Sequence, residues 1–573
     1  MKLLLDLKGI NYNIYNMKRL QLECLGTILF LNVFFSIFIS GLFWLIGLSI
    51  NAFIFPLAFI ISSVYAYKKY GSVKLEVTFS IVLILCCILI GVVLPDTSWD
   101  GQAYHQSCVY ALSHGWNPIY QFHQIIFTNG LAGEKWINHY AKGIETAEAT
   151  IVALTGNLES GKTINFLFGF SSFFYLITFL KKNLKADGIS NKRVFFYAFL
   201  LAFPNIFFSQ FLTFYIDYAA YYIVLMLLLC FINLYRGKDI RQAYFFIFVS
   251  VFMATTIKFN MLFWTGYATF FYLVFLLLKK RHSEMKSLFS VYMVSVITAL
   301  LTSGFNPYIT NSIDHHNPIY PLGISSDNIE YLADGALAES LAGKGRIRQV
   351  IESLFSRPNN AFVKEYIPFY KILPQNIVST SLSDTRLGGG GFFFVDLFII
   401  TLLVLFLLRK GKYYSTFLFF SLITFSTMFI LPFGALHRYV SYVYLIPIIA
   451  LVYVDINYRK KWLSYAYSIL LVLNIFITCS TVLAYNLLYK YSIHYYISQI
   501  RLNNIEVKTV NWSFIYKLNG NKLDVKDTFI QTTDTIGQEG YVMPMNRSFK
   551  IYLKDNKKID KPFLIKKLEK QNK

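Results

Sequence analysis

Residues 24–67 read CLGTILFLNVFFSIFISGLFWLIGLSINAFIFPLAFIISSVYAY and contain no Asp, Glu, Lys or Arg over 44 positions. A helix needs about 20 apolar residues to cross the hydrocarbon core of a bilayer. The stretch is therefore long enough for two membrane-spanning helices in succession. Over the whole chain, hydrophobic residues make up 55% and charged residues only 15%. A soluble protein of 573 residues cannot hide that much apolar surface, so the composition excludes one.

Further apolar stretches continue the pattern along the chain. They are residues 77–95, 163–180, 194–216, 218–235, 242–257, 259–278, 287–313, 392–408 (interrupted by Asp396), 413–437, 439–454 and 462–489. The sequence thus predicts an all-α, polytopic protein with about 13 spans. We expect two spans in residues 1–74, a transmembrane core over 75–487, and a small outer domain over 488–573. Short β-like runs lie in that last part, at 507–516 and 548–553.

The distribution of basic residues predicts the orientation. With the N-terminus in the cytoplasm, the short segments facing the cytoplasm hold 25 of the 53 Lys and Arg residues. Loops 95–162 and 305–391 and the C-terminus then lie outside and carry any chemistry, in part on interfacial helices. The net charge of +22 reflects this topology, so we expect no nucleic-acid partner.

Targeting and cysteine patterns add further expectations. Residues 1–19 are polar, so no cleavable signal peptide is expected. Richness in Ile, Lys, Asn, Phe and Tyr is typical of an AT-rich genome and favours a bacterial plasma membrane. The six cysteines form no CxxC or zinc spacing, and adjacent His315 and His316 diverge, so no metal site is predicted.

Two carboxylates follow the third predicted span, in Pro95-Asp96-Thr97-Ser98-Trp99-Asp100. Asp96 and Asp100 are four residues apart and can share one helical face, with Pro95 opening the helix and Asp96 in its first turn. Such a pair can bind a divalent cation or act as a general base on a hydroxyl. The alternative is a capped interfacial helix with solvated carboxylates.

The same loop mixes polar groups with Trp and Tyr. His105, His139 and Lys142 lie among aromatic residues that suit the headgroup layer. The set fits either an aromatic belt on interfacial helices or a site for a lipid phosphate and a sugar.

Single charges interrupt other apolar stretches at predicted outer turns. Asp217 and Lys258 are functional candidates because ionisable groups near a membrane are costly. The alternative is that each turn needs only a polar residue. Arg438 can bind a lipid phosphate or extend to anionic headgroups. Asp384-Thr385-Arg386 precedes four glycines, which permit close backbone approach to a ligand or a hinge.

Residues 156–163, GNLESGKT, match the P-loop pattern GxxxxGK[ST]. A P-loop needs a strand before it and a soluble helix after it. Here Thr163 opens an apolar span on the predicted outer side. We therefore reject nucleotide binding by Lys162.

The ordered set of outer segments resembles the GT-C superfamily of polytopic glycosyltransferases, which take sugars from polyprenyl-phosphate carriers. The resemblance covers roughly residues 70–455. It is carried by Trp99-Asp100-Gly-Gln-Ala-Tyr104-His105, Tyr215-Ile-Asp217, Thr256-Ile-Lys258-Phe, Gly304…Pro307-Tyr308…Asn317-Pro318-Ile-Tyr320-Pro321, Asp384-Thr-Arg386…Gly-Gly and His437-Arg438-Tyr439.

The resemblance implies a GT-C-like fold and roles for individual residues. Asp100 takes the place of the acid that activates the acceptor, with Asp96 as second candidate. Lys258, Arg386 and Arg438 contact the donor phosphate. We count Tyr104, His105, His139, Lys142 and Asp217 as further substrate-binding residues.

These observations favour a membrane glycosyltransferase that moves a sugar from a polyprenyl-phosphate carrier to a cell-envelope glycan, lipid or protein on the outer face. A lipid-carried donor is expected because nucleotide sugars are absent outside the membrane. No cofactor is expected beyond a possible divalent cation. The alternatives are a transporter for a glycolipid or polysaccharide, which should show broken helices and charges at the bilayer midplane, and a polysaccharide polymerase.

Overall fold

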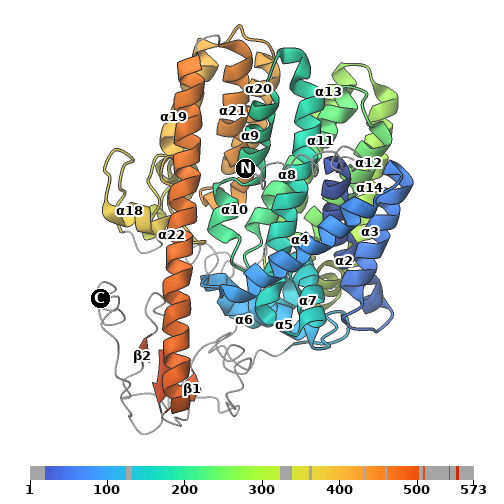
Figure 1. Ribbon diagram of the computed structural model, residues 1–573, viewed down its shortest axis with the longest axis vertical. Helices are drawn as coiled ribbons and strands as arrows, with labels where there is room; N and C mark the ends of the chain where they lie inside the picture. The colour runs from blue at the N-terminus through green and yellow to red at the C-terminus, as the bar shows by residue number, and fades with distance from the viewer. Residues whose placement is uncertain are drawn as a thin grey trace, which may run out of the picture.

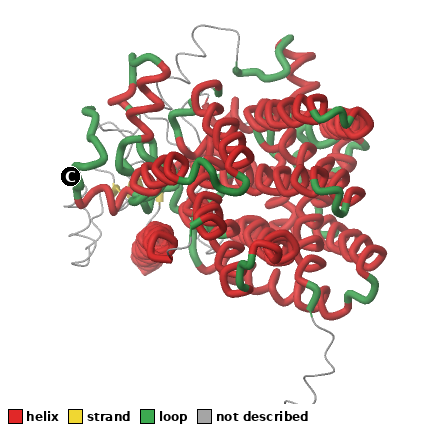
Figure 2. Tube along the Cα trace, turned by 90° about the horizontal axis from the view of Figure 1, so that it is seen from above, coloured by secondary structure: helices red, strands yellow, loops and turns green. Residues whose placement is uncertain are grey.

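The computed structural model describes residues 20–123, 132–322, 338–359, 364–431, 433–458, 461–502, 507–509, 541–542 and 550–553. Helices make up about three quarters of this part of the chain (Figures 1 and 2), which confirms the predicted all-α class. The predicted cytoplasmic segment 1–19 lies outside the described residues.

Nine helical segments of the described chain are long and apolar enough to cross a membrane. They contain α2 (Leu22–Leu45), α4 (Lys74–Val93), α8 (Thr163–Leu184), α11 (Asp217–Tyr235), α12 (Ile240–Ile257), α13 (Phe259–Leu278), α14 (His282–Leu301), α21 (Leu445–Asn457) with the preceding 3₁₀ helix η6 (His437–Tyr444), and α22 (Lys461–Leu502). This confirms a membrane protein built of many apolar helices.

Four other predicted spans have a different form. α3 (Ile54–Tyr70), α19 (Phe394–Leu407) and α20 (Tyr414–Ile430) are apolar but shorter than the nine. The stretch 194–216 is divided into α9 (Asn191–Ala202) and α10 (Asn205–Gln210), because Pro204 offers no N–H and cannot continue a helix. The count of 13 spans therefore remains a prediction.

Short helices and turns connect the long ones. They are η1 (Gly101–His105), α5 (Gln106–Ser113), α6 (Ala132–His139), α7 (Gly143–Thr155), η2 (Leu158–Lys162), η3 (Lys185–Asp187), η4 (Phe305–Ile309), α15 (Thr310–His315), η5 (Glu339–Leu341), α17 (Arg346–Leu354) and α18 (Pro374–Ser379). Figure 1 shows α5, α6 and α7 gathered at one end of the bundle.

The C-terminal part differs from the predicted boundary. α22 continues to Leu502, past residue 488 where we placed the start of the outer domain, and projects beyond the bundle (Figure 1). Beyond it, β1 (Val507–Thr509), β3 (Lys550–Leu553) and β2 (Tyr541–Val542) form an antiparallel sheet in the order β1-β3-β2. β1 and β3 fall within the predicted β-like runs, and the rest of 503–573 lies outside the described residues.

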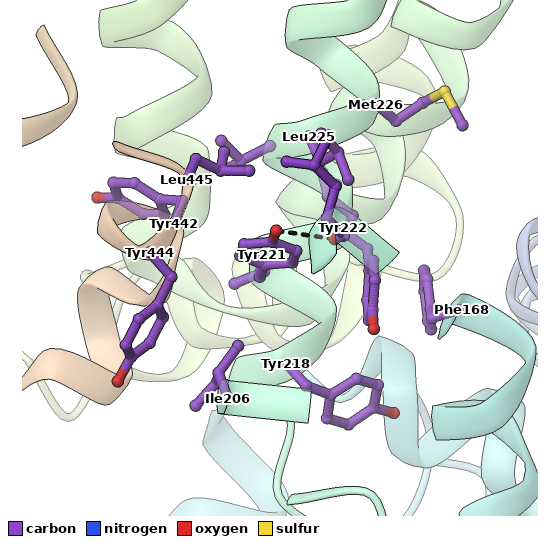
Figure 3. Packing of buried hydrophobic residues seen from close by; sticks show 14 of the residues in the cluster. Phe168, Ile206, Tyr218, Tyr221, Tyr222, Leu225, Met226, Tyr442, Tyr444 and Leu445 are labelled. Atoms are coloured by element: carbon purple, nitrogen blue, oxygen red, sulfur yellow. Dashed lines mark hydrogen bonds between the residues drawn. The ribbon is translucent and has the colours of Figure 1, made fainter. Parts of the chain in front are cut away.

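The centre of the bundle is α11, which is buried on nearly all sides. Its Tyr221 and Tyr222 lie among aromatic and aliphatic side chains of α8 and α21 (Figure 3). The two hydroxyls donate to the carbonyls of Leu201 (2.8 Å) and Ala202 (2.5 Å). The chain break at Pro204 leaves these carbonyls without helical partners, and in a membrane such groups must be satisfied internally. The tyrosines thus stabilise the broken helix.

Ion pairs join several helix ends near the short basic loops. Lys182, at the end of α8, pairs with Glu23 of α2 at 2.9 Å. Arg193 of α9 pairs with Asp455 of α21 at 2.7 Å. These contacts join segments that the charge distribution assigned to one side of the membrane.

Candidate functional site

Arg438 is the centre of a group of buried charges. Its Nη1 lies 2.9 Å from Asp100 Oδ2 and 3.9 Å from Asp217 Oδ2, and its Nε lies 3.2 Å from Asp384 Oδ1. Only 6% of the Arg438 side chain is exposed. One guanidinium therefore faces three carboxylates that are far apart in the sequence.

Two further cations complete the group. Lys258 Nζ lies 2.6 Å from Asp217 Oδ1, and Arg386 Nη2 lies 2.6 Å from Asp384 Oδ2. We call the resulting set of three carboxylates and three cations the charged cluster; it consists of Asp100, Asp217, Lys258, Asp384, Arg386 and Arg438. Its formal charges balance.

Helix ends place these residues. Lys258 is an extended residue between α12 and α13, and Asp217 begins α11, where the helix dipole favours a carboxylate. Gln210 supports Asp217 because its side-chain amide lies 3.3 Å from Asp217 Oδ2, while its oxygen accepts from the backbone N–H of Tyr218. Arg438 lies in the first turn of η6.

Two tyrosines form an aromatic wall around the cluster. Lys258 Nζ lies 3.8 Å from the centre of the Tyr439 ring, and Arg438 Cζ lies 5.0 Å from the Tyr215 ring centre. The Tyr215 hydroxyl oxygen accepts from the backbone N–H of Asp100 at 3.3 Å. Ring faces attract cations, so the wall holds the basic groups without neutralising them.

Asp100 is ionised in this arrangement. Burial alone raises the pKa of its carboxyl, but Arg438 and Arg386 outweigh burial and hold that pKa below its usual value. Asp100 and Asp384 are each 16% exposed at the side chain, more than Arg438. Their carboxylates therefore form the accessible side of the cluster. While paired with Arg438, Asp100 is a weak proton acceptor.

Asp96 lies elsewhere, and the predicted helix starting at Pro95 is wrong. Residues 95–98 are not helical, and Asp96 is fully buried. Its carboxylate accepts from the backbone N–H of Ser98 (2.7 Å) and of Phe214 (3.3 Å). These bonds compete with helix formation, as short acidic side chains often do. Asp96 and Asp100 therefore do not share a helical face, and Asp96 fixes the loop to the segment before α11.

Tyr104 and His105 occupy the π-helical turn η1 that follows Asp100. His105 Nδ1 lies 2.7 Å from Glu145 Oε1, and both side chains are buried. The Tyr104 ring lies 4.2 Å from the His105 ring, and burial followed by the Asp100 carboxylate raises the pKa of Tyr104. π-Helical turns are frequent at functional sites. Glu145 thus orients His105 next to the cluster.

His139 and Lys142 connect loop 95–162 to loop 305–391. His139 Nδ1 lies 2.9 Å from Asn311 Oδ1, and Lys142 Nζ donates to Asn306 Oδ1 and to the carbonyl of Tyr140. Burial lowers the pKa of Lys142 to about 8. Their hydrogen-bond partners are Asn311, Asn306 and Tyr140 rather than members of the charged cluster, so these two predicted residues belong to a neighbouring loop junction.

The structure thus brings together five predicted residues, namely Asp100, Asp217, Lys258, Arg386 and Arg438. It adds Asp384, Tyr215 and Tyr439, which the sequence reasoning quoted in motifs without assigning them to the site. Each lies one or two residues from a member that was assigned. Charge balance could have identified Asp384, because the three predicted cations near a membrane need a third carboxylate besides Asp100 and Asp217.

The P-loop-like segment has no nucleotide-binding context. Helix α7 precedes it, η2 covers residues 158–162, and α8 begins at Thr163. Lys162 is fully buried and donates to the Leu94 carbonyl and to Glu159. Its ammonium group is therefore committed to protein acceptors.

Across the residues with described positions, no group of three His, Cys, Asp or Glu side chains is placed to hold a metal ion. No family model, curated protein or solved structure matches the chain.

Proposed function

We propose that the chain is a bacterial plasma-membrane glycosyltransferase that uses a polyprenyl-phosphate-linked sugar. The charged cluster carries this proposal, because it sets three cations and an accessible carboxylate at helix ends of a membrane protein. The proposed orientation puts the N-terminus in the cytoplasm and the cluster and C-terminus outside. The acceptor is a cell-envelope glycan, lipid or protein.

The proposed reaction uses an exchange of partners at Arg438. A donor phosphate takes the place of Asp100 on Arg438 and draws on Arg386 and Lys258, since guanidinium groups bind phosphate with paired donors. Asp100 then loses the contact that keeps its pKa low and becomes a better base. It takes the proton of the acceptor hydroxyl while the acceptor oxygen bonds to the sugar C1. The C1–O bond to phosphate breaks, and the phosphate leaves with the electron pair.

The remaining predicted residues have proposed places in this reaction. Tyr104 and His105 face the acceptor beside Asp100, and Asp217 holds Lys258. His139 and Lys142 lie at the junction of the two outer loops, where a sugar chain can enter.

The test is sugar transfer by the purified chain from a panel of synthetic polyprenyl-phosphate sugars to cell-envelope extracts. Asp100→Asn should lower the rate by about 10²–10⁴, the usual effect of removing a general base. Asp455→Asn is the matched control, because it also removes an Asp–Arg pair but lies 17 residues along from Arg438, roughly 25 Å away by helical rise. It should keep near-normal turnover. Equal activity in both variants contradicts the role of Asp100.

A transporter is the second candidate. The break between α9 and α10 at Pro204 favours it, since discontinuous helices form substrate sites in many transporters. If the chain moves a glycolipid across vesicle membranes and transfers no sugar, this candidate replaces the transferase.

A further inference from the structure

Arg346 lies at the start of α17 with an uncompensated charge. Its Nε and Nη2 are buried, and neither donates a hydrogen bond to any residue with a described position. Arg348, two residues along, differs because it pairs with Glu352 at 2.7 Å and is 70% exposed. The Arg346 side chain as a whole is only half-buried, but these two nitrogen atoms are removed from water without an acceptor, which is costly and points to a ligand that supplies negative charge.

An open hollow of about 750 Å³ lies beside Arg346. Its wall includes Ile347, Ile351 and Tyr366, together with Arg348 and Glu352, whose charges are paired with each other. Ile347 and Ile351 are 66% and 46% exposed, and their spacing of four residues puts them on one side of α17. The hollow thus combines one unpaired cation with an apolar ridge, which matches an amphiphilic anion.

A contact with α22 places α18 beside a membrane-spanning helix. Thr380, at the end of α18, contacts the hydroxyl of Thr481 at 2.9 Å, and Thr481 lies inside the apolar span of α22. The adjacent Ile377 and Val378 are 41% and 63% exposed. Figure 1 shows α18 at the side of the bundle next to α22. Exposed aliphatic side chains at this depth face lipid rather than water.

Two contacts fix α17 relative to α18 and the bundle. Asn376 of α18 donates from its side-chain amide to the Pro358 carbonyl at 3.1 Å, four residues after α17 ends. Ser353 of α17 donates to the Ala435 carbonyl at 2.6 Å, three residues before Arg438. The wall of the hollow contains no residue of the charged cluster.

We infer that the hollow binds an anionic phospholipid of the surrounding leaflet. The phosphate of the headgroup compensates Arg346, and the acyl chains run along Ile347 and Ile351. Arginine suits this role because its planar group binds phosphate oxygens with paired donors and is more weakly hydrated than an ammonium. The inference does not depend on the proposed transferase activity.

The test counts lipids retained by the purified full-length chain in native mass spectrometry. The probes are phosphatidylglycerol, phosphatidylcholine and inorganic phosphate. The wild type should retain phosphatidylglycerol in preference to phosphatidylcholine. Arg346→Gln should weaken that retention about tenfold, the effect of losing a charge-assisted hydrogen bond. Arg348→Gln, the matched control on the same wall, should weaken it clearly less, because the Arg348 charge is already paired with Glu352.

Two conservative variants, which should still fold, keep the test decisive if Arg346→Gln misfolds. Arg346→Lys keeps the charge and loses the paired donors, and Ile347→Ser changes only an exposed side chain. Each should weaken phosphatidylglycerol retention several-fold. Unchanged retention in both, equal loss in Arg346→Gln and Arg348→Gln, or no preference over phosphatidylcholine overturns the inference. Full displacement of the lipid by equimolar inorganic phosphate overturns it in favour of a free-phosphate site.

Discussion

Arg438→Gln should destabilise the protein more than any other single change in the charged cluster. At an effective dielectric constant of about 20, gross attraction is about 6 kcal/mol at the 2.9 Å distance to Asp100 and about 4 kcal/mol at the 3.9 Å distance to Asp217. Desolvation offsets most of this. The decisive point is that Asp217 keeps Lys258, whereas Asp100 keeps no direct cation. We therefore expect a loss of about 3–5 kcal/mol, as for other broken buried pairs.

A double-mutant cycle separates this effect from general damage. Asp100→Asn alone should cost about 1–2 kcal/mol, because Arg438 still has Asp384 at 3.2 Å. Asp100→Asn combined with Arg438→Gln removes the carboxylate that the arginine change leaves unpaired. The double variant should therefore be more stable than Arg438→Gln alone.

The pH dependence of stability should reverse between the two proteins. In the wild type, the pKa of Asp100 is held below its usual value, so the pair contributes stability above the ordinary carboxyl range and loses it as pH falls through the folded-state pKa. In Arg438→Gln, the attraction and the hydrogen bond of Arg438 are lost and only the weaker effect of Arg386 opposes burial, so we expect the pKa of Asp100 to rise and acid to relieve the penalty. The assay is unfolding of detergent-solubilised protein followed by circular dichroism from about pH 2 to 7, which covers the ordinary carboxyl range and the region below it. Additive changes in the cycle, or parallel pH curves, refute the reasoning.

Four further predictions concern other regions. An impermeant thiol reagent should label Ala342→Cys in intact cells and Ser72→Cys only after lysis; the reverse pattern contradicts the proposed orientation. Purified protein should show no ATP binding by equilibrium dialysis, with or without Lys162→Ala, because Lys162 is buried against protein acceptors. Stability should rise as pH increases from about 8 toward 10.5, since the unfolded chain binds the Lys142 proton more tightly, and Lys142→Met should remove this slope in chemical unfolding. Asp96→Asn should lower stability by about 1–3 kcal/mol in the same assay. The backbone N–H groups of Ser98 and Phe214 donate to the two carboxylate oxygens of Asp96, and the NH₂ group of the new asparagine side chain cannot accept either bond.

The sequence predicts helices more reliably than contacts in this protein. Charge-free stretches mark where helices lie because a membrane requires apolar side chains over a fixed length. Asp217 and Lys258 could be singled out for the same reason, since each is a costly exception. Their pairing across 41 residues, and that of Asp100 with Arg438 across 338, depends on tertiary packing and leaves no local pattern.

Asp96 shows why local spacing misleads. Its distance of four residues from Asp100 suits a helix, and Pro95 is a good first residue for one. The backbone N–H of Phe214, 118 residues away, instead takes the Asp96 carboxylate and holds the loop in a non-helical form. Such a long-range hydrogen-bond donor cannot be inferred from the residues around Asp96.

The balance of charges in the cluster restricts which ligand can act there. A neutral ligand leaves the Asp100–Arg438 pair intact, and Asp100 then remains a weak base. An anion changes this, because it competes with Asp100 for Arg438 and adds negative charge close to a carboxylate with limited exposure to water. Both effects raise the affinity of Asp100 for a proton. In the proposed transfer, the donor phosphate must therefore bind before the acceptor hydroxyl can be deprotonated, and the same contact that neutralises the leaving group activates the base.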